Sequence, residues 1–169
     1  MATPSRMRIK CLGNLTFTVD DGASHTGSTT ITTIQTQYVA WAGGAAFGGD
    51  ANNDGVANGL AWVLGATDKN ANALPLLPTM DNTSDPDFFI FTYRRDDDAN
   101  TDPNTTIKAE YGSTLAAWTP AVHDGTDIII TPTDEGAGVG IDLVQVKIRR
   151  TLAVGGKLFA RLKAEVATR

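Results

Sequence analysis

The chain has 169 residues, of which 41% are hydrophobic, so it is long enough for one domain with a real core, or for one domain plus a short accessory segment. Its formal net charge of −5 argues against a nucleic-acid-binding protein, because such proteins need a basic surface to displace the counterions of phosphates. The single cysteine, Cys11, excludes an internal disulfide and a multi-cysteine zinc cluster. No stretch approaches the ~20 apolar residues of a membrane helix, so we expect no membrane insertion.

Residues 1–35 are predicted to form a separate N-terminal segment of strand and linker. The segment from Leu15 to Val19 alternates apolar and polar residues, as a half-buried strand does, and a turn signal follows at Asp20-Asp21-Gly22. The Ser/Thr-rich stretch from Ser24 to Thr33 fits either another strand or a linker. We expect the rest of the chain, residues 36–169, to form the main module.

Two short helices are predicted at the start of this module. The first covers residues 36–42, where apolar side chains share one helical face and Gly43-Gly44 supplies a stop: Tyr38, Val39, Trp41 and Ala42. The second is a helical turn built on Leu60, Val63 and Leu64, which Gly65 can end in a left-handed conformation. The connector at residues 68–79 carries Leu74, Leu76 and Leu77, which could lie across a core.

Five short strand-like segments fill the second half of the chain, separated by turn-rich linkers: 88–93, 106–111, 128–131, 143–148 and 158–163. Such spacing favours an antiparallel sandwich or a partly open barrel. The predicted fold class is therefore mostly β, an antiparallel β-sandwich with a short helix-loop-helix of calcium type.

The loop between the two predicted helices carries the strongest chemical signal. Calcium loops place oxygen ligands at positions 1, 3, 5, 7 and 9 and a glycine at position 6, where the chain turns sharply. Counting from Asp50, Gly55 takes position 6, and the ligand positions fall on Asp50, Asn52, Asp54, Val56 and Asn58. Val56 would contribute only its backbone carbonyl, so its side chain is free to enter the core. These residues predict a site for a hard cation, with calcium as the cofactor.

Position 12 departs from the calcium pattern. Such loops place a bidentate Glu or an Asp there, whereas this chain has Ala61. Water, a carbonyl or a carboxylate from elsewhere, such as Asp68, could complete the coordination. The alternative is that Asn53-Asp54-Gly55 is a turn whose backbone is bonded by Asp50. We favour cation binding, because five residue types match in one register.

Other candidate sites have ordinary structural explanations. The acidic residues Asp96 to Asp98 with Asp102 could chelate a metal or hydrolyse a glycoside, but acids between two strands usually form a solvated hairpin loop. Trp41 is expected in the core and Trp62 half-buried, which leaves Trp118 as the tryptophan best placed to stack on a sugar, although packing is favoured there too. No catalytic constellation is recognisable, so we expect no enzyme.

The order of the motifs resembles a module common near the C-termini of large secreted proteins of Verrucomicrobia and related bacteria. The resemblance covers about Gln37 to Val166, and the loop is similar to those of dockerin and thrombospondin type 3 repeats. It is carried by these segments: Tyr38-Val39-Ala40-Trp41, Gly49 to Leu60, Trp62-Val63-Leu64-Gly65, Phe91 to Arg95, Tyr111-Gly112-Ser113 with Trp118, Val146 to Arg150, and Lys157 to Leu162. The family usually has an acidic residue where this chain has Ala61.

The resemblance implies export, a C-terminal position in a longer chain and a non-catalytic role, with ion ligands carried only onto the five loop positions above. We therefore expect a non-catalytic structural or adhesive module, stabilised by calcium and secreted or held at a bacterial cell surface. The alternative is a carbohydrate-binding module of a secreted degradative protein, with Trp118 as its stacking platform. Expected partners are the calcium ion and cell-surface or polysaccharide components, without nucleic acid.

Overall fold

The computed structural model describes residues 15–20, 26–31 and 37–167. By its internal contacts the chain divides into two units, Met1–Thr36 and Gln37–Arg169, and each is described by itself. Cys11 and the predicted turn at Asp21-Gly22 lie outside the described residues.

The first unit contains one antiparallel pair of strands, β1 (Leu15–Asp20) and β2 (Thr26–Ile31). Leu15 lies opposite Ile31, and Asp20 lies opposite Thr26. The strand predicted from Leu15 to Val19 is confirmed, and residues 26–31 of the Ser/Thr-rich stretch form a strand rather than a linker.

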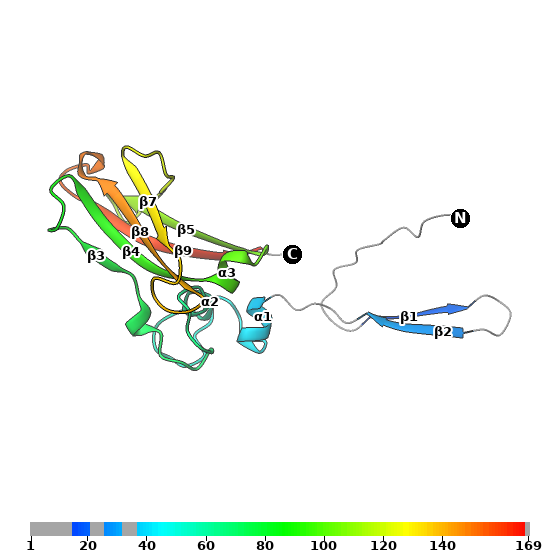
Figure 1. Ribbon diagram of the computed structural model, residues 1–169. Coiled ribbons are helices and arrows are strands. Elements are labelled where there is room, and N and C mark those ends of the chain that lie inside the picture. The colour runs from blue at the N-terminus through cyan, green and yellow to red at the C-terminus, as the bar shows by residue number, and fades with distance from the viewer. Residues whose placement is uncertain (1–14, 21–25, 32–36, 168–169) are drawn as a thin grey trace, which may run out of the picture. The chain divides into compact units, whose positions relative to one another are not determined.

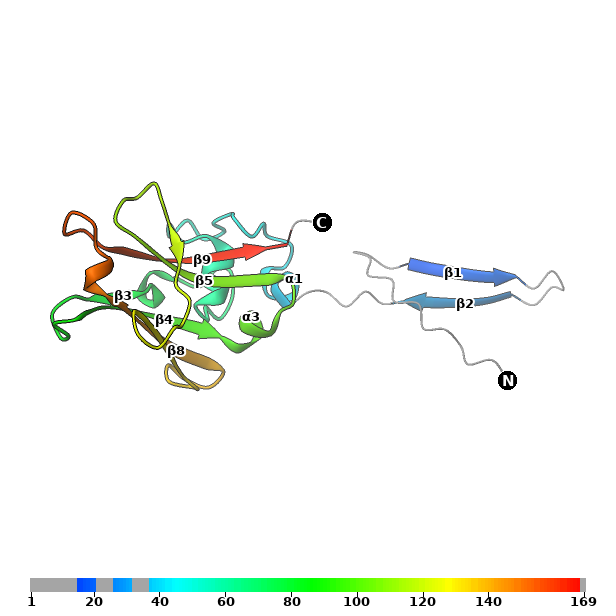
Figure 2. The same ribbon diagram turned by 90° about the horizontal axis from the view of Figure 1, so that it is seen from above.

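The second unit is mostly β and consists of two antiparallel sheets with a few short helices (Figures 1 and 2). The four-stranded sheet has the order β3-β4-β8-β7, and the three-stranded sheet has the order β6-β5-β9. The strands are β3 (Thr79–Asp81), β4 (Phe88–Asp96), β5 (Thr105–Gly112), β6 (Thr119–Pro120), β7 (Ile128–Thr133), β8 (Ile141–Arg149) and β9 (Phe159–Val166). All five predicted strands are present, and β3 and β6 were not predicted.

The main core lies between the two sheets, an arrangement consistent with a β-sandwich. Strand β8 shows how the sequence builds it, because Val144, Val146 and Ile148 are fully buried on one face. The intervening residues of β8, including Lys147, are only half-buried on the other face. From the three-stranded sheet, Ala109 of β5 joins the same core, with Leu162 of β9 packed against it.

Three short helices, α1 (Gln37–Ala42), α2 (Asn58–Val63) and α3 (Asp97–Thr101), gather at one end of the sandwich in Figure 1. Tyr38 and Trp62 form their shared core, which packs against Leu162 of β9. Trp62 is buried, with 3% of its surface exposed, where half-burial was expected. Trp41 packs against the same core but is only half-buried, and its indole N–H donates to the carbonyl of Ala66 at 2.8 Å.

The connector after α2 buries fewer of its three leucines than the sequence predicted. It forms the 3-10 turn η1 (Leu74–Leu76), and a second such turn, η2 (Arg150–Leu152), follows β8. Leu74 and Leu77 are 50% and 38% exposed, and only Leu76 packs on a core. Because residues three apart eclipse one another in a 3-10 turn, Leu74 and Leu77 share the solvent side while Leu76 points inward.

Candidate functional site

The predicted cation loop connects α1 to α2, and its two ends are tied together by Asn58, the first residue of α2. The Asn58 N–H donates to the Gly49 carbonyl at 2.6 Å. The Asn58 side chain is 4% exposed, and its amide donates to the Ala46 carbonyl (2.9 Å) while its Oδ1 accepts from the Ala51 N–H (3.0 Å). Asn58 is therefore a buried polar residue with both ends of its amide satisfied, as a residue that closes a loop must be.

The two carboxylates of the loop hold its turn from inside. Asp50 accepts from the Asp54 N–H (Oδ1, 3.3 Å) and from the Gly55 N–H (Oδ2, 2.8 Å). Asp54 Oδ1 in turn accepts from the Val56 N–H at 2.8 Å. Gly55 has φ of +87°, a left-handed conformation in which a side chain would be strained, so the glycine at this position is required by the turn.

The loop is closed on its open side by residues 71–73 of the connector, which sequence reasoning did not identify. The Asn52 Nδ2 donates to the Ala71 carbonyl (2.7 Å) and to Asp54 Oδ2 (3.0 Å). The Ala73 N–H donates to the same Asp54 oxygen at 2.7 Å. The bonds from Ala73 and Val56 lower the pKa of Asp54 below its ordinary value, because they stabilise the ionised carboxylate. No local sequence signal marks these contacts, since they depend on backbone groups 19 residues away.

Position 12 of the loop belongs to a core and not to the ion site. Val56 and Ala61 are 4% and 6% exposed and form a small apolar cluster with Ala66 and Ala73. Asp68, considered above as a replacement ligand, is exposed, and its Oδ1 accepts from the N–H of Asn70 at 2.7 Å. Its carboxylate caps its own turn and has no hydrogen bond to the loop.

The donor set of the loop fits a hard cation in kind but falls short of a full coordination sphere. It offers two carboxylates, the amide oxygens of Asn52 and Asn58, and the Val56 carbonyl, which make five oxygens if each carboxylate gives one, whereas calcium takes six to eight. The Asn58 oxygen already accepts from the Ala51 N–H. Within the described part of the chain, no group of three or more His, Cys, Asp or Glu side chains is placed so that it could hold a metal ion. The hydrogen bonds that Asp50 accepts from the backbone would also form in the simple turn considered above. The contacts are therefore compatible both with a cation site and with a turn that binds no ion.

Trp118 lies just before β6 and is half-buried. Its indole N–H donates to the Leu115 carbonyl at 3.2 Å, and the Arg161 guanidinium stacks 4.3 Å from the ring centroid. Arg161 is itself held by Glu110 at 2.6 Å. One face of the indole is therefore covered by a fixed cation, which leaves less aromatic surface for a sugar.

The acidic segment is not the solvated hairpin loop that the sequence suggested, because part of it forms α3. Asp96 caps this helix, with its Oδ1 accepting from the Ala99 N–H at 3.1 Å. Asp102 is 3% exposed and accepts from the N–H of Asn104 at 3.0 Å. Asp at an N-cap is a recognisable helix signal, but a five-residue helix is too short to produce a visible apolar period.

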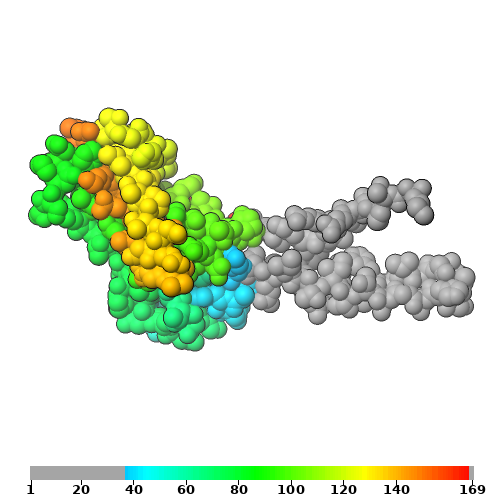
Figure 3. All heavy atoms as spheres, in the orientation of Figure 1, coloured from blue at the N-terminus to red at the C-terminus, as the bar shows by residue number. Residues whose placement is uncertain are grey.

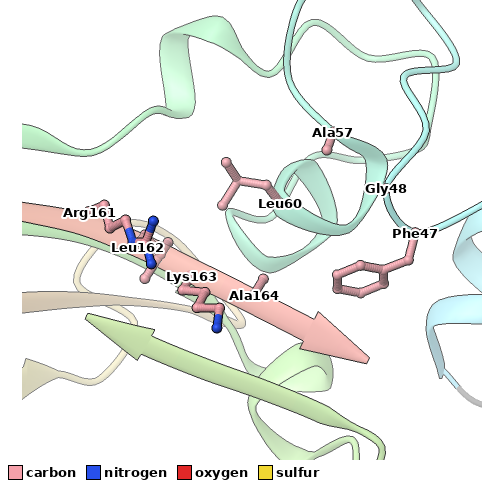
Figure 4. A pocket seen from close by; sticks show the side chains of 8 residues that line it. All are labelled: Phe47, Gly48, Ala57, Leu60, Arg161, Leu162, Lys163 and Ala164. Atoms are coloured by element: carbon pink, nitrogen blue, oxygen red, sulfur yellow. The ribbon is translucent and has the colours of Figure 1, made fainter. Parts of the chain in front are cut away.

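A shallow groove of about 270 Å³ separates the loop and α2 from β9 (Figure 4). Its apolar wall includes Phe47 and Leu60, and Arg161 and Lys163 of β9 line the opposite side. Both cations are already paired, Arg161 as described and Lys163 with Glu165 at 2.8 Å. The groove therefore offers no free charge that would select a ligand.

Searches of protein-family models, of curated proteins and of solved structures each find no match to this chain. The resemblance noted from the sequence motifs therefore stays a prediction. Among the described residues, no helix combines the length and the apolar character needed to cross a membrane.

Proposed function

We propose that residues 37–169 are a non-catalytic extracellular module, structural or adhesive in role, in which calcium bound at the Asp50–Asn58 loop stabilises the fold. The supporting observation is that one short loop joins three parts of the module. Asp54 bonds to Ala73 of the connector, and Asn58 ties α2 to the segment that follows α1. An ion held by this loop would fix all three together.

The stabilisation follows from mass action. An ion that binds the folded loop and not the unfolded chain raises the free energy of unfolding by RT ln(1 + [Ca²⁺]/Kd). Because Ala61 supplies no carboxylate, we expect a Kd of roughly 1 mM, in the range of extracellular calcium modules. At 10 mM calcium the gain is then about 1.4 kcal/mol.

The test is thermal unfolding of the whole chain with 10 mM calcium and with chelator, for the wild type and two matched variants. Asp50→Asn keeps the shape of the first ligand and removes its charge, while Asp68→Asn makes the same change at an exposed carboxylate outside the loop. We expect calcium to raise the midpoint for the wild type and for Asp68→Asn, and much less for Asp50→Asn. An unchanged midpoint in the wild type, or an equal rise in all three proteins, would contradict the proposal.

The extracellular setting and the bacterial cell surface enter this proposal from the resemblance of the motifs. The carbohydrate-binding alternative has less support, because Arg161 covers one face of Trp118. The proposal assigns no reaction to the module, since Asp96 and Asp102, the acids considered for hydrolysis, have structural partners in α3 and the turn after it.

A further inference from the structure

A second groove, of about 590 Å³, lies where α1, the end of α2, the start of α3 and the loop before β8 come together. It is separate from the calcium-type loop, none of whose ligand positions lines it. Its volume falls in the range of small-molecule sites, which combine apolar walls with a few placed polar groups.

The apolar part of its lining includes Trp41, Val139 and Ile141. The Trp41 ring is held in place by the bond from its indole N–H to the Ala66 carbonyl at 2.8 Å. Val139 is 89% exposed at the rim. A half-buried indole and an exposed valine in one lining offer apolar surface to a ligand.

The polar wall carries negative charge without a compensating cation. Asp96 and Asp98 line the groove, and its lining includes no Lys, Arg or His. None of the ion pairs between described residues involves either carboxylate. Asp98 accepts a long contact of 3.4 Å from the Gln37 amide, which leaves most of its capacity as an acceptor open.

The electrostatic state of Asp96 agrees with a missing counterion. Burial raises the pKa of Asp96, and the neighbouring carboxylates Asp97 and Asp98 raise it further, while the cap bond from Ala99 acts in the opposite direction. A positive charge placed in the groove would favour the ionised carboxylate and so act against the upward shift of this pKa.

We propose that this groove binds a small alkylammonium ion, with its charged head at Asp96 and Asp98 and its apolar stem along Trp41 and Val139. A metal ion fits less well, because two carboxylates among apolar walls cannot supply the six to eight oxygens of a hard cation. A neutral saccharide could also stack on Trp41, but it would leave the charge of the two carboxylates unused. The proposal is independent of calcium binding at the loop.

The test uses the full chain labelled with ¹⁵N and titrated with n-butylammonium, followed at the Trp41 indole N–H resonance. Ammonium supplies the charge without the stem, and 1-butanol supplies a stem without the charge. We expect n-butylammonium to shift the Trp41 resonance saturably and to bind more tightly than either control, while the Trp118 indole resonance stays unchanged.

Two adjacent aspartates give a matched pair of variants. Asp97 and Asp98 are both exposed in the first turn of α3, but only Asp98 lines the groove. We expect Asp98→Asn to weaken n-butylammonium binding about two- to fivefold, the effect of removing one exposed charge, and Asp97→Asn to change it less. Equal effects of the two substitutions would overturn the proposal. So would 1-butanol binding as tightly as the amine, or a neutral saccharide that shifts Trp41 and is unaffected by Asp98→Asn.

Discussion

Val56 anchors the loop to the module, and its truncation gives the most quantitative test of the account. The Val56 side chain is 4% exposed and packs with Ala61, Ala66 and Ala73. Val56→Ala removes the equivalent of two buried methylene groups, worth about 1.6 kcal/mol of transfer free energy. The cavity that remains raises the expected loss to about 2–3 kcal/mol, because the surrounding residues relax only partly into the space. The substitution keeps the backbone carbonyl, so the calcium-dependent part of the stability should be unchanged.

Urea unfolding of the full chain, with calcium and with chelator, measures both parts of this prediction. The control is Val139→Ala, the same chemical change at a side chain that is 89% exposed, which should cost less than about 0.5 kcal/mol. A Val56→Ala loss as small as that of the control would refute the claim that this side chain holds the loop to a core. Val56→Ala should lower the free energy of unfolding equally with calcium and with chelator. A decrease seen only with calcium would refute the claim that the side chain packs in the core independently of any ion bound by the Val56 carbonyl.

Three further predictions concern other parts of the second unit. Gly59→Ala should cost about 1–3 kcal/mol in urea unfolding, because its Cβ would lie 2.2 Å from the Phe47 ring, whereas Gly48→Ala meets no atom within 4 Å and should be tolerated. Asp96 has a raised pKa in the folded state, so its carboxyl favours folding at low pH and loses that contribution as pH rises through this pKa. Asp96→Asn keeps the helix cap and removes the charge that is unfavourable in the folded state. It should therefore raise the thermal midpoint at pH 7, where Asp96 is ionised, but not at pH 3, and the same rise at both pH values would contradict this pH dependence. If the carbohydrate alternative holds, glycan-array binding should be present and lost in Trp118→Ala.

Strand β8 was predictable because its sequence carries a period of two that the sandwich uses directly. In β8, the apolar residues Val144, Val146 and Ile148 alternate with polar ones, and these three are the fully buried residues. The strand β6 could not be predicted, since it has two residues and depends on pairing with β5. The exposure of Leu74 and Leu77 was missed for a related reason, because the backbone of a 3-10 turn decides which side each faces.

The site was predictable only as far as local spacing determines it. The sequence identified Asp50, Asp54 and Gly55 as parts of one turn, and the structure brings them together by hydrogen bonds. The hydrogen bond from the Ala73 N–H to the Asp54 carboxylate was not predictable. It forms because Ala73 packs in the same apolar cluster as Val56, which brings the connector against the loop. The groove at Trp41 was missed because its walls come from segments far apart in the chain.

The loop of the calcium proposal belongs to the second unit, one face of which Figure 3 shows with all its heavy atoms. The most direct measurement is a calcium titration of the ¹⁵N-labelled chain, followed at every backbone amide. We expect saturable shifts that are largest between Asp50 and Asn58, with the Gly55 amide among them, at a Kd of roughly 1 mM. Shifts absent from this loop, or largest at the acidic residues 96–102, would contradict the calcium proposal.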